Sequence, residues 1–369
     1  MAVVGVIGGG QLARMMIPAA VALGIELRVL AEAPESSARL AATAVGDYRD
    51  AATVLAFAHG CDVITFDHEH VPQQVLRALV AAGVAVHPGP DALLYAQDKL
   101  AMRERLAQLG VPQPDWARVE SADDLAGFLA DHGGRAVVKT PRGGYDGKGV
   151  RVVDDAHGAD DWLADGPVLV EELVRFEREL AQLVARRPRG DAQLWPLVET
   201  VQSGGVCAEV IAPAPRTTDA VERAAAEIAL SVAHGLGVTG VLAVELFAAT
   251  DGRVLVNELA MRPHNSGHVT IDGSTTSQFE QHLRAVLDWP LGDTTALAPW
   301  GVMINVFGAL LDPAIVVALD SQPGAKVHAY GKSARAGRKA GHVTVIGADL
   351  DTVAYQARAA ASAFDNAIA

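Results

Sequence analysis

The sequence predicts an α/β domain with a parallel sheet, followed by an α+β region and a small C-terminal domain. The first part of the chain alternates short apolar runs with Ala/Leu-rich helical segments, an order typical of a parallel sheet. From about residue 135 the apolar runs come in pairs with short connections, which is typical of antiparallel strands. A final segment after Pro299 adds two more apolar runs around a loop-rich stretch.

In the first part, we expect strands at 3–7, 27–30, 63–66 and 84–87, with helices between them. The proline and glycine residues within 87–90 then break the chain, and a helix is expected at 91–109. These patterns place a first domain, similar to a dinucleotide-binding domain, at 1–96.

Beyond that point, short apolar runs bounded by turn-forming residues predict the strands of the α+β region. They lie at 136–139, 150–153, 168–172, 179–185, 241–247 and 253–259. These runs place a second domain at 97–295. The last two runs, 302–307 and 342–346, are expected to be strands of a third, small domain at 296–369.

Composition narrows the classes of function. The net charge of −14 argues against a chain that coats nucleic acid or an anionic membrane, because phosphate groups would repel its average surface. Cys61 and Cys207 lie far apart without CxxC spacing, so we expect core residues and not a disulfide or a zinc site. The N-terminal segment has no cationic leader and the apolar runs are too short to span a bilayer, so the cytoplasm is the expected location.

Lysine is scarce, since it supplies only six of the 30 lysine and arginine residues. Two of the six flank a glycine-rich loop, Lys139-Thr-Pro-Arg-Gly-Gly-Tyr-Asp-Gly-Lys148-Gly, between two expected strands. Glycines allow backbone amides to approach phosphate oxygens closely, and an ammonium group binds them as a point charge. We expect this hairpin to fold over a triphosphate, although its spacing is not that of a Walker A loop. The alternative is a flexible hairpin tip.

Carboxylates interrupt two apolar runs, at Glu245 and at Asn257-Glu258. Such groups are costly to bury without a cation, and neighbouring carboxylates with an amide form a hard-oxygen site for Mg²⁺ that phosphates complete. The alternative is a set of buried ion pairs. The following segment, Arg262-Pro-His-Asn265-Ser-Gly-His268, is a dense group of donors for an anion beside the metal.

Two further segments indicate anion binding. Gly8-Gly-Gly-Gln-Leu-Ala13 fits a dinucleotide-binding turn with Glu32 as the ribose-binding acid, although any ligand at a helix N-terminus suits such a turn. The stretch between Asp320 and Asp349 has no acidic residue but contains five cations, which suits a sugar phosphate. A solvated basic loop is the alternative for this stretch.

In chain order, Lys139, the segments 143–149 and 171–174, Glu179, Glu245 and Asn257-Glu258 resemble the ATP-grasp superfamily. With Gly9-Gly-Gln-Leu12, 262–268 and 332–342, nearly the whole chain is similar to the carboxylating ATP-grasp ligases of purine biosynthesis. The resemblance implies an ATP-grasp fold, ATP and Mg²⁺ as cofactors, and a homodimer. It also implies that bicarbonate is activated as carboxyphosphate and transferred to aminoimidazole ribonucleotide.

The same resemblance implies roles for individual residues. Mg²⁺ would be bound by Glu245 and Glu258, and the flap 139–153 would close over the nucleotide. Bicarbonate and its activated product would be surrounded by Tyr145, Asp146, Lys148, Arg262, His264 and Asn265. The nucleotide monophosphate substrate would be bound by Gln11, Leu12, Lys332, Arg335, Arg338 and Lys339. ATP would be bound by Lys99, Lys139, Gly144, Tyr145, Asp146, Gly147, Lys148, Gly149, Val150, Glu171, Glu172, Leu173, Val174, Glu179, Gln202, Asn257 and Glu258.

Three other functions remain open from the sequence. A formate-dependent glycinamide ribonucleotide transformylase would share the nucleotide and metal residues. A biotin-dependent carboxylase would replace the imidazole nucleotide by biotin. An NAD-binding oxidoreductase would use only the first glycine-rich turn and Glu32.

Overall fold

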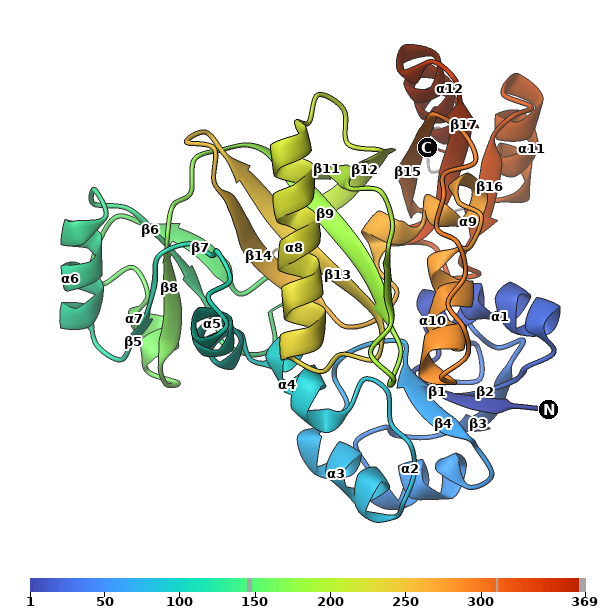
Figure 1. Ribbon diagram of the computed structural model, residues 1–369, viewed down its shortest axis with the longest axis horizontal. Coiled ribbons are helices and arrows are strands. Elements are labelled where there is room, and N and C mark those ends of the chain that lie inside the picture. The colour runs from blue at the N-terminus through green and yellow to red at the C-terminus, as the bar shows by residue number, and fades with distance from the viewer. Residues whose placement is uncertain (145–147, 310, 365–369) are drawn as a thin grey trace.

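The computed structural model describes residues 1–144, 148–309 and 311–364. Figure 1 shows a central sheet with the N-terminal domain below it, a small lobe on one side and the C-terminal segment on the other. No helix in this described part of the chain is long and apolar enough to cross a membrane.

The N-terminal domain has the expected parallel sheet, in the order β3-β2-β1-β4. Its strands and helices are β1 (Val3–Ile7), α1 (Gln11–Leu23), β2 (Glu26–Ala31), β3 (Ala42–Val45), α2 (Ala51–Ala58), β4 (Val63–Phe66) and α3 (Gln73–Ala81). The strand expected at 84–87 is wrong, because only an isolated bridge between Val86 and Ile64 forms before the prolines of 87–90. β3 was not expected, since this edge strand is partly exposed and lacks a continuous apolar run.

The single helix expected at 91–109 is also wrong. The chain forms α4 (Pro90–Gln97) and α5 (Lys99–Gln108), which meet at Asp98. Asp98 has extended backbone angles, and its carboxylate accepts hydrogen bonds from the backbone N–H groups of Leu100 and Ala101. This is an N-cap, which starts a new helix and makes Lys99 its first residue.

The small lobe is an antiparallel sheet in the order β5-β8-β6-β7. The strands β6, β7 and β8 were expected from their paired apolar runs, whereas β5 was not. Its elements are β5 (Trp116–Val119), α6 (Ala122–Asp131), β6 (Ala136–Lys139), β7 (Val150–Val153), α7 (Asp160–Leu163) and β8 (Val168–Glu172). Lys139 is the last residue of β6 and the glycine-rich loop connects β6 to β7.

The central sheet runs in the order β14-β13-β9-β11-β12-β15-β17-β16, with β10 paired to β9. Helix α8 (Asp219–Gly235) packs against β9, β13 and β14 (Figure 1). The strands are β9 (Phe176–Arg186), β10 (Ala192–Leu194), β11 (Val198–Ser203), β12 (Val206–Ala212), β13 (Gly240–Ala249), β14 (Val254–Ala260), β15 (Trp300–Gly308), β16 (Lys326–Ala329) and β17 (Arg335–Gly347). β10, β11, β12 and β16 were not expected. Apolar and polar residues are mixed in β10, β11 and β16, whereas the apolar run of β12 is interrupted by Glu209.

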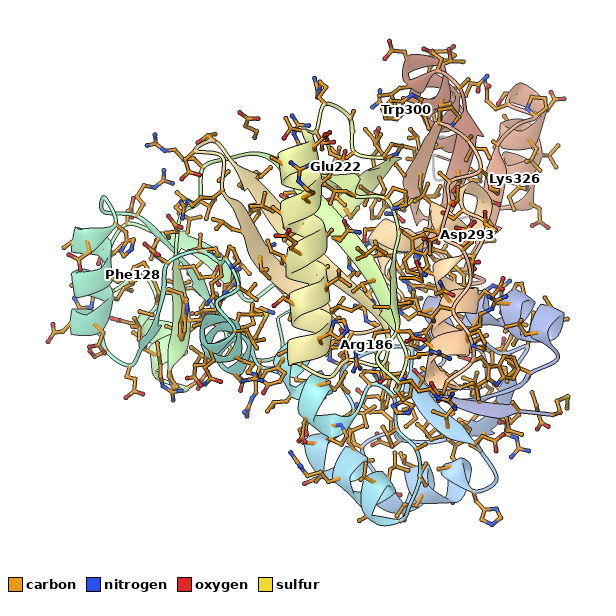
Figure 2. All side chains as sticks on the ribbon, viewed as in Figure 1. Phe128, Arg186, Glu222, Asp293, Trp300 and Lys326 are labelled. Carbon is orange, nitrogen blue, oxygen red and sulfur yellow. The ribbon has the colours of Figure 1, made fainter. Side chains whose placement is uncertain are left out.

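The C-terminal strands extend the same sheet, because β12 pairs with β15 through Val210 and Met303. Helices α11 (Asp312–Ser321) and α12 (Leu350–Ser362) belong to this part, and α12 packs against β15 and β17. Lys326, the first cation of the basic stretch, is exposed on β16 in this part of the molecule (Figure 2).

The connection between β14 and β15 joins the domains. It contains the short helix η1 (Asn265–Gly267), α9 (Thr270–Gly273) and α10 (Gln278–Val286). On α10, Phe279 and Leu283 share an apolar cluster with Leu12 and Met16 of α1. The N-terminal domain is therefore fixed beside the segment that follows β14, where the anion-binding residues were expected.

Candidate active site

A cavity of ≈ 470 Å³ lies between the small lobe and the central sheet. Many residues that were predicted from scattered parts of the sequence line it together. The lining residues are Lys99, Pro114, Val137, Lys139, Val150, Glu171, Glu172, Leu173, Val174, Phe176, Glu179, Thr200, Gln202, Gly205, Cys207, Glu245, Phe247, Asn257, Glu258, His264, Asn265 and Lys339.

Lys139 is held at the wall of this cavity by two acceptors. Its Nζ lies 2.8 Å from Glu171 Oε2 and donates to Asn257 Oδ1 at 3.2 Å. Buried Arg103 of α5 holds the other oxygen of Glu171, with Nε 2.7 Å from Oε1. Burial would raise the pKa of Glu171, but the positive charges of Arg103 and Lys139 lower it below its usual value. Glu171 is therefore a carboxylate, and its position fixes that of the Lys139 ammonium.

The two proposed metal ligands are direct partners on neighbouring strands, since Glu245 of β13 pairs with Glu258 of β14. The register then shifts, so that Leu246 pairs with Val256 and Asn257 is the extra residue of a β-bulge. Strand alternation alone would point Asn257 and Glu258 to opposite faces. The bulge allows both to line the cavity, while Val256 and Leu259 pack in the core beneath α8.

Arg103 also stabilises the bulge. It donates from its two terminal nitrogens to the carbonyl oxygens of Val256 and Asn257, each at 2.8 Å. These carbonyls lie where the ladder is interrupted and would otherwise need other partners. One buried guanidinium thus holds the lysine partner Glu171 and the backbone that presents the metal ligands.

Glu258 has a cation of the protein beside it. Lys99 Nζ donates to Glu258 Oε1 at 2.5 Å, and Lys99 begins α5 directly after the Asp98 cap. Asp98 also accepts a hydrogen bond from Arg142 of the β6–β7 loop at 2.9 Å. The base of the flap and the start of α5 are therefore held together at this edge of the cavity.

Glu245 lies next to the loop that follows β14. His264 Nε2 lies 3.2 Å from Glu245 Oε1. Burial would raise the pKa of Glu245, but the hydrogen bond from His264 and the positive charges of His264, Arg262 and Lys339 lower it below its usual value. The carboxylate is thus ionised, as a metal ligand must be. The described residues contain no group of three or more histidine, cysteine or acidic side chains that could hold a metal ion.

Arg262 is positioned by the N-terminal domain. Its Nε donates to Glu69 Oε2 at 3.1 Å, and Glu69 Oε1 accepts from the backbone N–H of Met261 at 2.6 Å. The residue Glu69 was not among the predicted site residues. It follows β4, so the contact depends on how the domains pack.

The wall of the cavity that is formed by the segment 171–174 and by strands β9 and β13 suits a nucleoside. The segment 171–174 joins β8 to β9 along the wall, and Phe176 stacks on Phe247 with ring centroids 4.6 Å apart. Glu179 also lines the cavity, and burial raises its pKa above the usual value. A side-chain hydrogen bond with Gln202 lowers this pKa but does not outweigh burial. Cys207 was expected in the core but also lines the cavity, and burial raises its pKa to about 12.

The first glycine-rich turn does not offer its amides to a dinucleotide. Glu32 Oε2 accepts from the backbone N–H of Gly9 at 3.0 Å, and its other oxygen lies 3.1 Å from His68 Nε2. Asp67 accepts from the backbone N–H of Ala13 at 2.8 Å. Two carboxylates of the protein thus occupy positions near the start of α1 where the dinucleotide hypothesis requires phosphate.

The residues expected around the substrate phosphate lie in several different places. Lys332 donates to Gln11 Oε1, and this contact joins the C-terminal segment to the start of α1. Leu12 packs in the N-terminal core. Arg335 and Arg338 are exposed on β17, where Arg338 donates to Ser333, whereas Lys339 lines the main cavity.

The flap is described in part. Lys148 is exposed, Gly144 and Gly149 are half-buried, and Val150 lines the cavity at the start of β7. Gly149 has a φ of 72°, a conformation that favours glycine. The predicted residues Tyr145, Asp146 and Gly147 lie outside the described residues.

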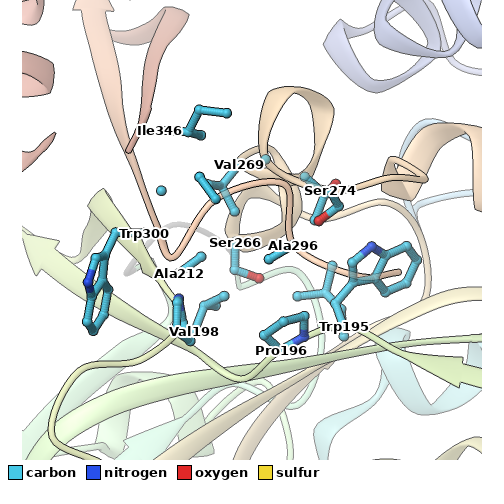
Figure 3. A pocket seen from close by; sticks show the side chains of 16 residues that line it. Trp195, Pro196, Val198, Ala212, Ser266, Val269, Ser274, Ala296, Trp300 and Ile346 are labelled. Atoms are coloured by element: carbon cyan, nitrogen blue, oxygen red, sulfur yellow. The ribbon is translucent and has the colours of Figure 1, made fainter. Parts of the chain in front are cut away.

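A second, apolar pocket is lined in part by Ser266 and Val269, which follow β14 (Figure 3). It has a volume of ≈ 20 Å³ and is lined by side chains that include Trp195, Trp300 and Ile346. None of the residues that line it is charged. This volume holds about one water molecule, so the pocket does not compete with the main cavity as a nucleotide site.

Comparisons with known proteins agree with this arrangement. The chain matches the ribonucleotide synthetase preATP-grasp domain over residues 1–97 and the ATP-grasp domain over 104–279. It matches the phosphoribosylaminoimidazole carboxylase C-terminal domain over 301–356. N5-carboxyaminoimidazole ribonucleotide synthase of Mycobacterium tuberculosis (strain ATCC 25618 / H37Rv) is 52% identical over 371 residues, which cover 97% of this chain and 86% of that protein. The chain belongs to the N5-carboxyaminoimidazole ribonucleotide synthase family.

Other members of this synthase family are similar along their whole length. The synthase of Corynebacterium ammoniagenes is 49% identical, with 100% of this chain and 93% of that protein covered. The crystal structure of the synthase from Aspergillus clavatus with ADP and 5-aminoimidazole ribonucleotide has a TM-score of 0.89 and 31% identity, with 99% of each chain covered. An ADP complex of a family member has a TM-score of 0.90 and 32% identity, covering 99% of this chain and 97% of that one. The expected ATP-grasp fold is confirmed.

Proposed function

We propose that this chain is an ATP-dependent carbon–nitrogen ligase that carboxylates 5-aminoimidazole ribonucleotide with bicarbonate. The products are N5-carboxyaminoimidazole ribonucleotide, ADP and phosphate. The observation that carries the proposal is the convergence of Lys139, Glu245 and Glu258 on one cavity of nucleotide size in a chain of this synthase family. The ligands in the crystal structure of the Aspergillus clavatus synthase, ADP and 5-aminoimidazole ribonucleotide, support the same substrates.

ATP is proposed to bind with its base against the linker 171–174 and its ribose near Glu179. Its phosphates then extend towards Lys99 and Lys139, whose ammonium groups neutralise charge on the transferred phosphoryl group. The flap 139–153 covers the phosphates and excludes water.

Mg²⁺ is proposed to bind between Glu245 and Glu258, with Asn257 beside them. The direct pairing of these carboxylates fits an ion that takes one or two carboxylates from the protein and its other ligands from phosphate and water. When bound, the ion neutralises charge on the phosphate oxygens. Lys99, which donates to Glu258 Oε1 in the structure, would place its positive charge beside the same phosphates.

Bicarbonate is proposed to bind beside the metal, near Arg262, His264, Asn265 and the flap residues Tyr145, Asp146 and Lys148. A bicarbonate oxygen attacks the γ-phosphorus and ADP leaves, which produces carboxyphosphate. Carboxyphosphate then releases phosphate and supplies CO₂ to the exocyclic amine of 5-aminoimidazole ribonucleotide. This amine loses a proton as the carbon–nitrogen bond forms. Because water would destroy carboxyphosphate, an enclosed cavity is needed.

The substrate monophosphate is proposed to bind at the contact between Gln11 and Lys332, assisted by Leu12, Arg335, Arg338 and Lys339. The Lys332–Gln11 contact supports this placement, since it brings a cation of the C-terminal segment to the start of α1. We also propose domain boundaries at 96/97 and 295/296, a homodimer and a cytoplasmic location.

The decisive experiment measures ADP formation from ATP. The expected result is ADP release that depends on both bicarbonate and 5-aminoimidazole ribonucleotide, with the carboxylated nucleotide as product. Stimulation by formate with glycinamide ribonucleotide, or by biotin, would instead favour the sister enzymes. Binding of NAD(H) without ATP turnover would contradict the proposal.

A further inference from the structure

Two side-chain amides from different parts of the fold form a reciprocal pair beside the cavity. Asn265 Nδ2 donates to Asn305 Oδ1 at 3.1 Å, and Asn305 Nδ2 donates to Asn265 Oδ1 at 2.7 Å. Asn265 begins η1 after β14, whereas Asn305 lies on β15 of the C-terminal segment. Both are buried, with exposed fractions of 8% and 5%.

The orientation of Asn305 is determined by a third group. Its Nδ2 also donates to the backbone carbonyl oxygen of Cys207 at 2.9 Å. A carbonyl oxygen only accepts hydrogen bonds, so the nitrogen of the Asn305 amide must face it. Rotation of this amide by 180° would place its oxygen against the oxygens of Cys207 and Asn265.

Asn305 in turn determines the orientation of the Asn265 side-chain amide, that is, the directions of its oxygen and its nitrogen. Both N–H groups of Asn305 are used, one by Cys207 and one by Asn265 Oδ1. The Asn265 amide therefore gives one N–H to Asn305 and retains a second. Asn265 lines the main cavity with His264 and Lys339, so this second N–H is a donor for a negatively charged occupant.

The course of the backbone around Asn265 is held separately. Gln278 accepts from the backbone N–H of His264 at 2.8 Å and donates to the carbonyl oxygen of His264, also at 2.8 Å. It also donates to His268 Nδ1 at 2.9 Å. Gln278 thus fixes the loop, and Asn305 contributes the orientation of one side chain within it.

We infer that Asn305 is a positioning residue that turns the Asn265 amide so that its N–H, and not its oxygen, faces the bicarbonate-derived anion. The inference rests on the proposed function, which places bicarbonate beside Asn265. Without Asn305 the amide rotates freely, and its carbonyl oxygen meets the anion in part of the molecules. Binding of ATP, whose proposed contacts are elsewhere in the cavity, is unaffected.

The test is a double-mutant cycle with Asn305→Leu and Asn265→Ala, in the full-length protein. Asn305→Leu preserves the shape of the side chain but removes its hydrogen bonds. We expect kcat/KM for bicarbonate to fall roughly tenfold, as for the loss of one hydrogen bond to a charged group, with an unchanged KM for ATP. In a protein that already carries Asn265→Ala, adding Asn305→Leu should lower kcat/KM for bicarbonate by less than about twofold.

The matched control is Thr344→Val. Thr344 lies on β17 opposite Met303, is fully buried, and its hydroxyl has no partner in the described part of the chain. The change is of equal shape and removes a polar group from the same sheet. It should leave kcat/KM for bicarbonate unchanged.

The inference would be overturned if Asn305→Leu lowered kcat/KM for bicarbonate equally in the unmodified protein and in the Asn265→Ala variant. It would also be overturned if Asn305→Leu left this kcat/KM unchanged. Asn305→Ala is taken through the same cycle, so that poor packing of leucine does not decide the result. Failure of both variants to fold would assign Asn305 to the core and also reject the inference. An unmodified protein without bicarbonate-dependent ADP formation would contradict the proposed function itself, which separates the two failures.

Discussion

Lys99 Nζ lies 2.5 Å from Glu258 Oε1, so a proposed metal ligand is already paired with a cation of the protein. The carboxylate of Glu258 is about two-fifths exposed, whereas Lys99 is largely buried. A divalent ion that approaches Glu258 therefore meets a carboxylate whose negative charge is already partly neutralised by Lys99. This pairing connects the metal site and the phosphate site before either is filled.

Lys99→Met should separate these two effects. Removing the ammonium frees Glu258, so Mg²⁺ without nucleotide should bind more tightly, while the KM for ATP should rise roughly tenfold because a charged phosphate contact is lost. Calorimetric titration with Mg²⁺ and steady-state kinetics measure the two quantities. If both affinities weaken together, Lys99 does not compete with the metal.

Lys139→Met should lower turnover by roughly 10²- to 10³-fold, the loss typical of one well-placed donor to a developing charge. Single-turnover ADP formation at saturating ATP measures it. Lys326→Met is the matched control, because this lysine is exposed on β16 and should tolerate the change. A turnover within a few-fold of the unmodified enzyme would remove Lys139 from the proposed mechanism.

Glu258→Gln should raise the Mg²⁺ concentration that gives half-maximal activity by more than roughly tenfold. Loss of a residue that only contacts a metal ligand typically lowers metal affinity by about that factor, and loss of the ligand itself should lower it further. Activity titrated with Mg²⁺ at fixed ATP provides the measurement. The control is Glu209→Gln on β12, whose carboxylate is paired with Arg358. An equal shift in both variants would show a general electrostatic effect and not a metal ligand.

The Glu32–His68 contact predicts a pH-dependent contribution to stability. The hydrogen bond from His68 lowers the pKa of Glu32 to about 2, with a further contribution from the backbone N–H of Gly9. A lowered pKa stabilises the folded state above the unfolded pKa of roughly 4.5, and this contribution is lost as the pH falls towards 2. Because the carboxylate is partly exposed, screening reduces its value to about 1–2 kcal/mol.

Glu32→Gln should therefore lower the free energy of unfolding at pH 7 by that amount. The difference between the two proteins should shrink as the pH falls below about 4.5. Urea unfolding at several pH values measures this difference. A constant difference across the range would exclude the proposed linkage.

Local sequence patterns were sufficient to predict those features that depend only on neighbouring residues. Glu245 and Glu258 could be identified because carboxylates in apolar runs are costly to bury without a cation. Lys139 could be identified because it ends an apolar strand before a glycine-rich turn. The parallel and antiparallel sheets followed from the order of apolar runs. The Asp98 cap is consistent with local chemistry, since Asp is one of the preferred N-cap residues.

Only the tertiary structure decided how these groups meet. Arg103 holds Glu171 and the bulge carbonyls, Glu69 holds Arg262, and Asn305 orients Asn265. Each contact joins residues that are far apart in the chain, and nothing in the local sequence indicates the partner. The sequence alone determined which chemical groups are present and some of the strands that carry them, such as those of Lys139, Glu245 and Glu258, but not β11 and β12, which carry Gln202 and Cys207. Their mutual geometry was decided by strand register, a β-bulge and domain packing, because hydrogen bonds depend on distances that only the folded chain defines.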